Sequence, residues 1–346
     1  VQDAGGRRAG SGLFSPASNI RLRMLKRGPK PFDRDELARR IVAANERRAV
    51  LGRDAYRVVH GEADFLPGLF VDRYDDAYAV QATCAGMDAI LGAVTDVLVE
   101  RFEPRAVVLR NNAASRAREG LPREIQGAVG SAPILAKLRE GQLHYEVDLL
   151  GEQKTGAFLD QVDNHVRVRD FARGRGFDGF TYHGGFALQL AAGGCSEVIA
   201  ADQSISALDV VRRRAQSGGL DAVQTLESDV TELLPEWADA GERFDTVVID
   251  PPAFASTRAT VKRALRAYEQ LNSSAMRCMN TGGVLVSCSC SGQVTGADFD
   301  EMLAQAARSA GRRVLMLERR GAGLDHPVLA GVPETEYLKC RILQVV

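Results

Sequence analysis

Hydrophobic residues follow a regular pattern in the second half of the chain. From about residue 150 onward, short apolar runs rich in β-branched residues alternate with segments whose apolar residues recur every three or four positions. The first spacing is typical of buried strands and the second of amphipathic helices. Their alternation indicates a parallel sheet covered by helices, and therefore an α/β domain. The predicted strands are 177–180, 197–201, 223–226, 244–249, 283–287, 313–317 and 337–344, and the predicted helices are 186–192, 206–217, 261–279 and 299–310.

The first 149 residues have a different organisation. Residues 20–25 alternate apolar and basic side chains like a half-buried strand, so residues 1–31 are predicted to be the last strands of a small β-rich module. The chain starts at Val1 without an initiator Met, and we expect it to be a fragment. Residues 32–53 are predicted to form a connecting helix. Residues 54–149 contain short β-rich runs at 56–60, 69–72, 77–81, 106–110 and 143–147 around an amphipathic helix at 87–102, which predicts a compact α+β domain.

Composition limits the classes of protein to consider. The 346 residues are 45% hydrophobic and 26% charged, which is ordinary for a globular protein of two or three domains. The formal net charge is only −1, so any nucleic acid must bind local basic clusters. Each cluster taken singly is more often a solvated surface than a binding site. The clusters are Arg21, Arg23, Lys26, Arg27 and Lys30, then Arg167, Arg169, Arg173 and Arg175, and then Arg212–Arg214.

Cysteine usage and hydropathy bear on the compartment. Six scattered cysteines are too few for a disulfide framework in a chain of this length, which indicates a reducing cytoplasm. No apolar stretch approaches the roughly 18 residues that span a bilayer. The cysteines and histidines lack the spacing of a zinc site, so no metal is expected. We therefore expect a cytoplasmic protein without a membrane or metal partner.

The first three predicted strands of the α/β domain end in glycines and acidic residues. Residues 178–186 read Asp-Gly-Phe-Thr-Tyr-His-Gly-Gly-Phe, a turn whose Gly184 and Gly185 let the backbone approach a ligand. Asp202 follows the second strand, where an acidic side chain binds ribose hydroxyls in nucleoside-binding sheets, and Asp229 follows the third, where it would meet an adenine. Each aspartate alone is more commonly a helix cap. Together with Asp178 at the first strand end, they favour S-adenosylmethionine over a nicotinamide.

The fourth strand runs into Asp250-Pro251-Pro252-Ala253-Phe254. Two prolines fix the backbone and remove N–H donors, giving a stiff strand exit that can direct Asp250 toward a planar base. Phe254 can then pack on that base. The alternative is a proline-terminated strand with a buried phenylalanine.

Cys290 follows the fifth predicted strand, within Ser289-Cys290-Ser291. Cytosine C5 is too poor a nucleophile to accept a methyl group directly, so a thiolate must first add to C6. Asp250 would hydrogen-bond or protonate N3 as the adduct forms. The alternative is that Cys288 and Cys290 are small buried residues. The neighbouring Asp-Pro-Pro favours Cys290 as nucleophile and leaves Cys288 to packing.

Motifs along the whole chain resemble the bacterial ribosomal large-subunit RNA cytosine-5 methyltransferase I family. They are Gly151–Asn164, Tyr182–Phe186, Asp250–Phe254, Arg266–Asn272, Ser289–Ser291, Asp325–Val328 and Pro333–Lys339. The resemblance implies an N-terminal PUA RNA-binding domain, present here only as its back half in residues 1–31, and a class I methyltransferase domain with a Rossmann-like seven-stranded sheet in residues 150–346. It also implies S-adenosylmethionine as cofactor and ribosomal RNA, before full subunit assembly, as partner. A homodimer is compatible with it.

The resemblance assigns roles to individual positions. Cys290 and Asp250 match the catalytic pair of the family. The cofactor-binding positions are Gln153, Thr155, Phe158, Asp160, Gln161, Asp178, Tyr182, Gly184, Gly185, Asp202, Asp229, Asp250 and Pro251, and the substrate-binding positions are Lys154, Pro252, Phe254 and Tyr268.

The chain departs from this family at His183, Gly179, His165 and Asn112, and it has Ala253 where two-cysteine RNA methyltransferases have a second cysteine. The base that removes the C5 proton is therefore not identified. Two alternatives stay open: a related enzyme that methylates a guanine nitrogen, and an RNA-binding assembly factor whose methyltransferase domain has decayed.

Overall fold

The chain folds into two compact units. The computed structural model describes residues 1–151, 157–255 and 257–346. Unit 1 comprises residues 1–159 together with Leu324–Gly331, and unit 2 comprises Asp160–Gly323 and Val332–Val346. The chain therefore passes between the units three times, because an eight-residue segment near the C-terminus belongs to unit 1. Nothing in the sequence pattern predicted that insertion.

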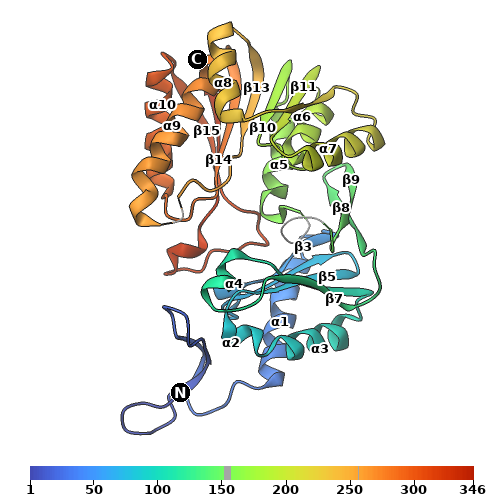
Figure 1. Cartoon of the computed structure of the whole chain (residues 1–346), viewed down its shortest axis with the longest axis vertical. Helices are drawn as coiled ribbons and strands as arrows, with labels where there is room; N and C mark the ends of the chain where they lie inside the picture. Colours follow the sequence, from blue (N-terminus) through green and yellow to red (C-terminus); the bar gives the residue numbers. More distant parts are fainter. Residues whose placement is uncertain (152–156, 256) are drawn as a thin grey trace. The chain divides into compact units, whose positions relative to one another are not determined.

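Unit 1 is built on antiparallel and mixed sheets with helices against one face (Figure 1). Within the described residues its sheets have the orders β1-β2, β3-β4-β5-β6-β7 and β8-β9. Its strands are β1 (Gly10–Phe14), β2 (Leu22–Arg27), β3 (Ala55–His60), β4 (Leu69–Tyr74), β5 (Ala77–Ala82), β6 (Ala106–Asn111), β7 (Glu124–Val129), β8 (Leu135–Glu140) and β9 (Leu143–Asp148). Its helices are α1 (Arg34–Ala49), α2 (Ala85–Asp88), α3 (Leu91–Phe102) and α4 (Ala114–Arg118).

Two expectations for this unit are corrected. The helix predicted at 87–102 is two helices, since α2 ends at Asp88 and α3 begins at Leu91. The strand predicted at 143–147 is present as β9, but it pairs with β8 in a separate ribbon. The connecting helix is α1, which Asp33 caps by accepting a hydrogen bond from the Glu36 amide at 3.0 Å.

Unit 2 is a three-layer α/β domain. Its sheet has the order β12-β11-β10-β13-β14-β16-β15 within the described residues, and β16 runs antiparallel to both of its neighbours. The strands are β10 (Arg175–Gly179), β11 (Glu197–Asp202), β12 (Val223–Glu227), β13 (Phe244–Ile249), β14 (Met279–Ser289), β15 (Val314–Arg320) and β16 (Lys339–Val345). The helices are α5 (Val162–Val168), α6 (Gly185–Ala192), α7 (Ile205–Ser217), α8 (Val230–Ala240), α9 (Val261–Arg277) and α10 (Gly296–Ser309).

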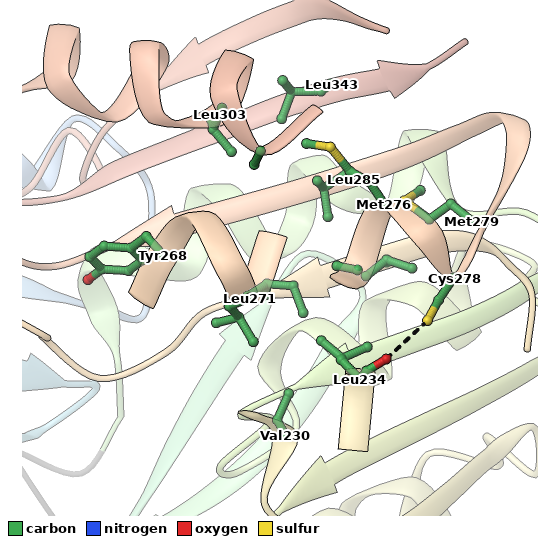
Figure 2. Packing of buried hydrophobic residues seen from close by; sticks show 14 of the residues in the cluster. Val230, Leu234, Tyr268, Leu271, Met276, Cys278, Met279, Leu285, Leu303 and Leu343 are labelled. Atoms are coloured by element: carbon green, nitrogen blue, oxygen red, sulfur yellow. Dashed lines mark hydrogen bonds between the residues drawn. The ribbon is translucent and has the colours of Figure 1, made fainter. Parts of the chain in front are cut away.

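Helices cover both faces of this sheet (Figure 1). Helices α5, α6 and α7 contribute buried residues on one face, and α8, α9 and α10 contribute them on the other. Figure 2 shows part of the second core, where Leu271 and Met276 of α9 pack with Leu285 of β14 and Leu303 of α10. Tyr268 stands at one side of the group drawn there. The sequence analysis did not predict α5 or α8.

A buried ion pair ties the 324–331 segment to the rest of unit 1. The Arg48 guanidinium is 2% exposed and donates two hydrogen bonds to the Asp64 carboxylate, at 2.8 and 2.7 Å. Its Nε donates to the Asp325 carbonyl at 2.9 Å, and the Arg57 amide donates to the Asp325 side chain at 2.8 Å. Beside the pair, burial lowers the pKa of His60 to about 2, so this imidazole is neutral. The Asp64 carboxylate is therefore balanced by Arg48 and by Arg47, whose Nη2 lies 2.6 Å from Asp64 Oδ1.

We predict that Arg48→Met lowers the free energy of unfolding by about 1.5–3 kcal/mol, because the buried Asp64 carboxylate loses two charge-assisted hydrogen bonds and keeps only Arg47, whose side chain is 52% exposed, as a cationic partner. Urea unfolding followed by circular dichroism measures the change. Arg105→Met is the matched control: its ion pair with Asp76 is about half exposed (48% and 52%), so its loss should cost less than about 1 kcal/mol. Equal losses in the two variants would contradict this account of Arg48.

Candidate active site

The carboxyl ends of the parallel strands of unit 2 bring the predicted site residues to one edge of the sheet. Residue 179 pairs with both Ala201 of β11 and Ile249 of β13, and Ile249 pairs with Ser287 of β14. The turn at Gly184, then Asp202, Asp250 and Cys290, therefore follow neighbouring strands. This edge is where ligands bind in open α/β sheets.

The turn after β10 requires both of its glycines. Gly184 caps α6 with φ +82°, a conformation that favours glycine. A Cβ on Gly185 would lie 2.3 Å from the His165 ring, so this position admits no side chain. His165, which departs from the family pattern, therefore packs directly against the start of α6. Tyr182 has φ +47°, and its ring stacks on His183 with 3.7 Å between centroids.

Asp178 is the buried acidic group of this turn. Its Oδ2 accepts hydrogen bonds from the Thr181 hydroxyl at 2.6 Å and the Ala187 amide at 2.8 Å. Its Oδ1 is buried and has no hydrogen-bond partner among residues 1–151, 157–255 and 257–346. Burial raises the pKa of the Asp178 carboxyl to about 7, although the two donors act in the opposite direction.

The Asp202 carboxylate can accept more hydrogen bonds than the two that its backbone donors supply. Its two oxygens accept the amides of Tyr182 and Ser204, each at 2.9 Å. A carboxylate oxygen accepts about two hydrogen bonds, so each oxygen can take one further donor. That arrangement fits the two hydroxyl groups of a ribose.

Asp229 has the capping role that the sequence left open as the commoner alternative. It is the N-cap of α8, and its Oδ1 accepts the Thr231 amide at 2.8 Å. The Thr231 hydroxyl and this cap lower the pKa of Asp229, and Gln203 donates to its second oxygen at 2.5 Å. A direct contact with adenine stays a prediction.

A chain of amide hydrogen bonds orients Asp250. Gln161, 2% exposed, donates from Nε2 to Asp250 Oδ2 at 2.9 Å. Its Oε1 accepts from Asn164 at 2.7 Å, and the Asn164 oxygen accepts from Arg320 at 2.8 Å. Because Asn164 fixes which end of the Gln161 amide is the donor, Asp250 receives a neutral N–H. Sequence reasoning placed Gln161 at the cofactor, and its bond to Asp250 was not foreseen.

Cys290 lies between two serines that are anchored in the protein. Ser289 and Ser291 are both fully buried and both hydrogen-bond the Tyr268 hydroxyl, at 3.0 Å each. The Ser291 hydroxyl also accepts the Ala255 amide at 3.1 Å. This last bond joins the segment after Asp-Pro-Pro to the segment that carries Cys290.

The two neighbouring cysteines have different environments. Cys290 is half-buried, whereas Cys288 is fully buried and lies opposite Cys340 of β16. Burial raises the pKa of the Cys288 thiol well above its ordinary value. A fully buried neutral thiol is a packing group, which agrees with the interpretation of Cys288 from the sequence.

Three predicted substrate-binding residues follow the end of β13 or lie on α9. Pro252 is exposed and Phe254 is half-buried, with its ring 4.6 Å from that of Tyr268. Tyr268 itself is 0% exposed. The side chain is enclosed in the core and supports the serines around Cys290, and its contact with substrate stays a prediction.

The other predicted cofactor residues are placed as follows. Asp160 accepts the Tyr337 hydroxyl at 2.7 Å, and Pro251 is buried. Phe158 belongs to unit 1, just before the chain enters unit 2. Gln153, Lys154 and Thr155 lie outside the described residues.

Comparisons with known proteins decide the family. A family model described as S-adenosylmethionine-dependent methyltransferase matches residues 130–333. Ribosomal RNA large subunit methyltransferase I of Klebsiella pneumoniae is 37% identical, and the match covers 99% of this chain and 89% of that protein. The protein of the same name from an Enterobacter species is 35% identical over 99% of this chain and 90% of its own length. The chain belongs to the ribosomal RNA large subunit methyltransferase I family.

A solved structure shares the fold of this family member. It is described as an S-adenosylmethionine-dependent methyltransferase from Streptococcus mutans, with a TM-score of 0.85, 16% identity, and coverage of 99% of this chain and 90% of that chain. The α/β methyltransferase fold expected from the sequence is confirmed, with a mixed sheet. The chain is accordingly an enzyme of the S-adenosylmethionine-dependent class.

One residue of the site was not singled out by the sequence analysis. Lys339, 2% exposed, pairs with Ser289 across β14 and β16, and its ammonium donates to the Ser291 carbonyl at 2.7 Å. Lys339 is the last residue of the motif Pro333–Lys339, where the sequence alone does not distinguish it from a charged surface residue. The available signal was a lysine that directly follows Leu338 within the strand predicted at 337–344.

We predict that replacing Asp178 with Asn changes how stability depends on pH. The folded-state pKa is raised to about 7, so the protonated form contributes stability that is full below about pH 4 and is lost as pH rises through about 7. Asp178→Asn abolishes this dependence. Relative to wild type, the variant should gain about 3 kcal/mol between pH 5 and pH 8.

Fluorescence of Trp237, the sole tryptophan of the chain, reports this change because its ring packs 5.2 Å from that of Phe177 in β10. Thermal unfolding of wild type and variant at the two pH values gives the difference. Asp221→Asn, which removes an exposed carboxylate, is the control and should show no such gain. A constant difference between Asp178→Asn and wild type across this range would rule out a buried protonated Asp178.

Proposed function

We propose that this methyltransferase modifies C5 of a cytosine in large-subunit ribosomal RNA through a covalent adduct between Cys290 and C6. The proposal rests on two groups that follow adjacent strands. The half-buried Cys290 follows β14, and the Asp250 carboxylate, which Gln161 orients, follows β13. Methylation of a guanine nitrogen needs no cysteine, because the nitrogen attacks the methyl donor itself. The family relatives named for large-subunit ribosomal RNA support the choice of RNA.

The protein residues act in two coordinated steps. Cys290 Sγ donates an electron pair to C6, which forms the C–S bond and shifts electron density to C5 and N3. Asp250 hydrogen-bonds or protonates N3 as the ring loses aromaticity, a contribution of about 10²–10⁴-fold. C5 then accepts the methyl group with the electron density it has gained. A base removes the C5 proton, whose electron pair restores the C5–C6 double bond, and the Sγ–C6 bond breaks with its electron pair returning to sulfur. Ala253 cannot act as the base for that proton.

The residues of the first two strand ends fit the methyl donor. Asp202 has capacity for two ribose hydroxyls, and the glycines at 184 and 185 allow close approach to the backbone. When bound, S-adenosylmethionine supplies the electrophilic methyl group that C5 accepts. We assign Asp178, Tyr182, Gly184, Gly185, Asp202, Asp229 and Gln161 to this pocket, with Asp160 and Pro251 in its surroundings.

For RNA binding we propose the hairpin β1-β2 as a PUA-like element. Arg21, Arg27 and Lys30 are exposed and form no ion pair with the described residues. The middle basic cluster supports RNA binding less well, since Arg167 pairs with Glu318 and Arg175 with Glu197 and Glu242. The cytosine must be unpaired or flipped, because C6 is not accessible inside a stacked duplex.

Cys290→Ala should reduce methyl transfer to ribosomal RNA by more than about 10³-fold, because the proposed attack on C6 requires the Cys290 thiolate. Cys288→Ala is the matched control and should retain most activity, since Cys288 is a buried packing residue. RNA containing 5-fluorocytidine extends the test. Fluorine cannot leave as the C5 proton does, so wild type and Cys288→Ala should form an adduct stable in a denaturing gel, and Cys290→Ala should not. Normal methylation by Cys290→Ala would eliminate the covalent route.

We also expect stronger methylation of protein-free 23S ribosomal RNA than of intact large subunits, because an accessible base is required. Mass mapping of the product identifies the base and the methylated atom. Detection of an N-methylguanine would replace the cytosine proposal by its main alternative. Equal rates on free RNA and intact subunits would contradict the need for an early, unassembled substrate.

A further inference from the structure

The nucleophile of the proposed reaction has a buried ammonium group beside it. Lys339 is 2% exposed, and a charged lysine at that depth is rare without an opposing charge or a full set of acceptors. Its ammonium has three N–H donors. Two are used, by the carbonyls of Ser291 at 2.7 Å and Tyr337 at 2.8 Å. The third has no acceptor among the described parts of the chain.

A thiolate at Cys290 would supply a negative charge opposite this ammonium, which binds the carbonyl of the next residue, Ser291. Burial lowers the pKa of Lys339 to about 8, and the charge of Cys290 is the strongest of the influences that raise it. Arg341 on the same strand lowers it further, and Glu336 raises it. Arg341 is itself paired with Asp300, and Glu336 is exposed. The hydroxyl groups of Ser289, Ser291 and Tyr268, which hydrogen-bond one another next to Cys290, are neutral.

The backbone around Cys290 is held so that this proximity is maintained. Lys339 lies opposite Ser289 in the register of β14 and β16, and it binds the carbonyl of Ser291. The side chains of Ser289 and Ser291 both bind Tyr268, and Lys339 binds the Ser291 carbonyl. Both neighbours of Cys290 are therefore held in place. These contacts hold the backbone of Cys290 beside the strand that carries the Lys339 ammonium.

We propose that Lys339 is the positioning residue that stabilises Cys290 as a thiolate, both before attack on C6 and when the sulfur leaves. The thiol proton goes to water, Lys339 stays protonated, and the net charge of the pair falls from +1 to 0. On release, the C–S electron pair returns to sulfur and the same ammonium stabilises it. The inference rests on the proposed role of Cys290 as nucleophile.

Alkylation of Cys290 by iodoacetamide tests this inference without RNA or S-adenosylmethionine. The reagent is neutral and reacts with the thiolate, so its rate against pH gives the apparent pKa of Cys290. The other five cysteines are buried, and peptide mass analysis assigns the modified residue. Wild-type protein should titrate below the ordinary thiol value of about 8.5. A midpoint at or above that value would overturn the proposal even if no variant folds.

Two variants separate charge from structure. Lys339→Gln keeps an N–H donor but removes the charge, and we expect the midpoint to rise by about one unit, a roughly tenfold lower rate at pH 7. Lys339→Arg keeps the charge and should retain the wild-type midpoint. Arg319→Gln removes an exposed cation that binds Asp300 and is the matched control. Circular dichroism verifies the fold of each protein.

The outcomes distinguish this inference from the proposed function. An unchanged midpoint in folded Lys339→Gln would show that Lys339 only holds the Ser291 and Tyr337 carbonyls. If Cys290→Ala methylates RNA normally while the Lys339→Gln midpoint rises, the electrostatic pair stands and the methylation mechanism falls. If adduct formation requires Cys290 but its midpoint is independent of residue 339, only the role of Lys339 is lost.

Discussion

The active-site edge of unit 2 depends on how buried polar groups around Cys290 are satisfied. Ser289, Ser291 and Tyr268 are all enclosed by the core, where an unpaired hydroxyl group costs about 1–3 kcal/mol. Each finds its partner in the others, and Ser291 reaches the Ala255 amide as well. The geometry of the nucleophile is therefore a consequence of core packing. A tyrosine on α9 is needed because only an aromatic side chain can fill the apolar space and still present a hydroxyl there.

The same principle organises the neighbouring strand ends, but with different chemical results. At Asp250, the Gln161 amide, which Asn164 orients, supplies a neutral donor to a half-buried carboxylate. At Asp178, complete burial with one oxygen left unpaired favours the protonated acid. Asp202 has two backbone donors and stays half-buried. Three aspartates at adjoining strand ends thus differ in burial and in hydrogen bonding because their surroundings differ.

Sequence patterns predicted the elements of unit 2 best where the strands are fully buried. The strand at 244–249 has the predicted bounds, since its apolar, β-branched run stands out from its flanks. Helix α8 was missed because it is short and contains Pro235, which usually marks a break. In unit 1, β8 and β9 alternate buried and exposed residues, but their separation from the larger sheet is a tertiary feature without a local signal. The family motifs located Asp250 and Cys290, whereas the burial of Tyr268 and the bonds of Lys339 depend on packing between segments far apart in sequence.

The return of residues 324–331 to unit 1 has a consequence for synthesis of the protein. Arg48 and Arg57 bind Asp325, so a cluster that begins near the N-terminus is completed by a residue more than 260 positions later. Domains commonly fold as they leave the ribosome, N-terminal first. Here unit 1 cannot reach its final packing until nearly all of unit 2 has been translated. The strand β16 that carries Lys339 follows directly after this segment, so the two units complete their folding almost together, at the end of translation.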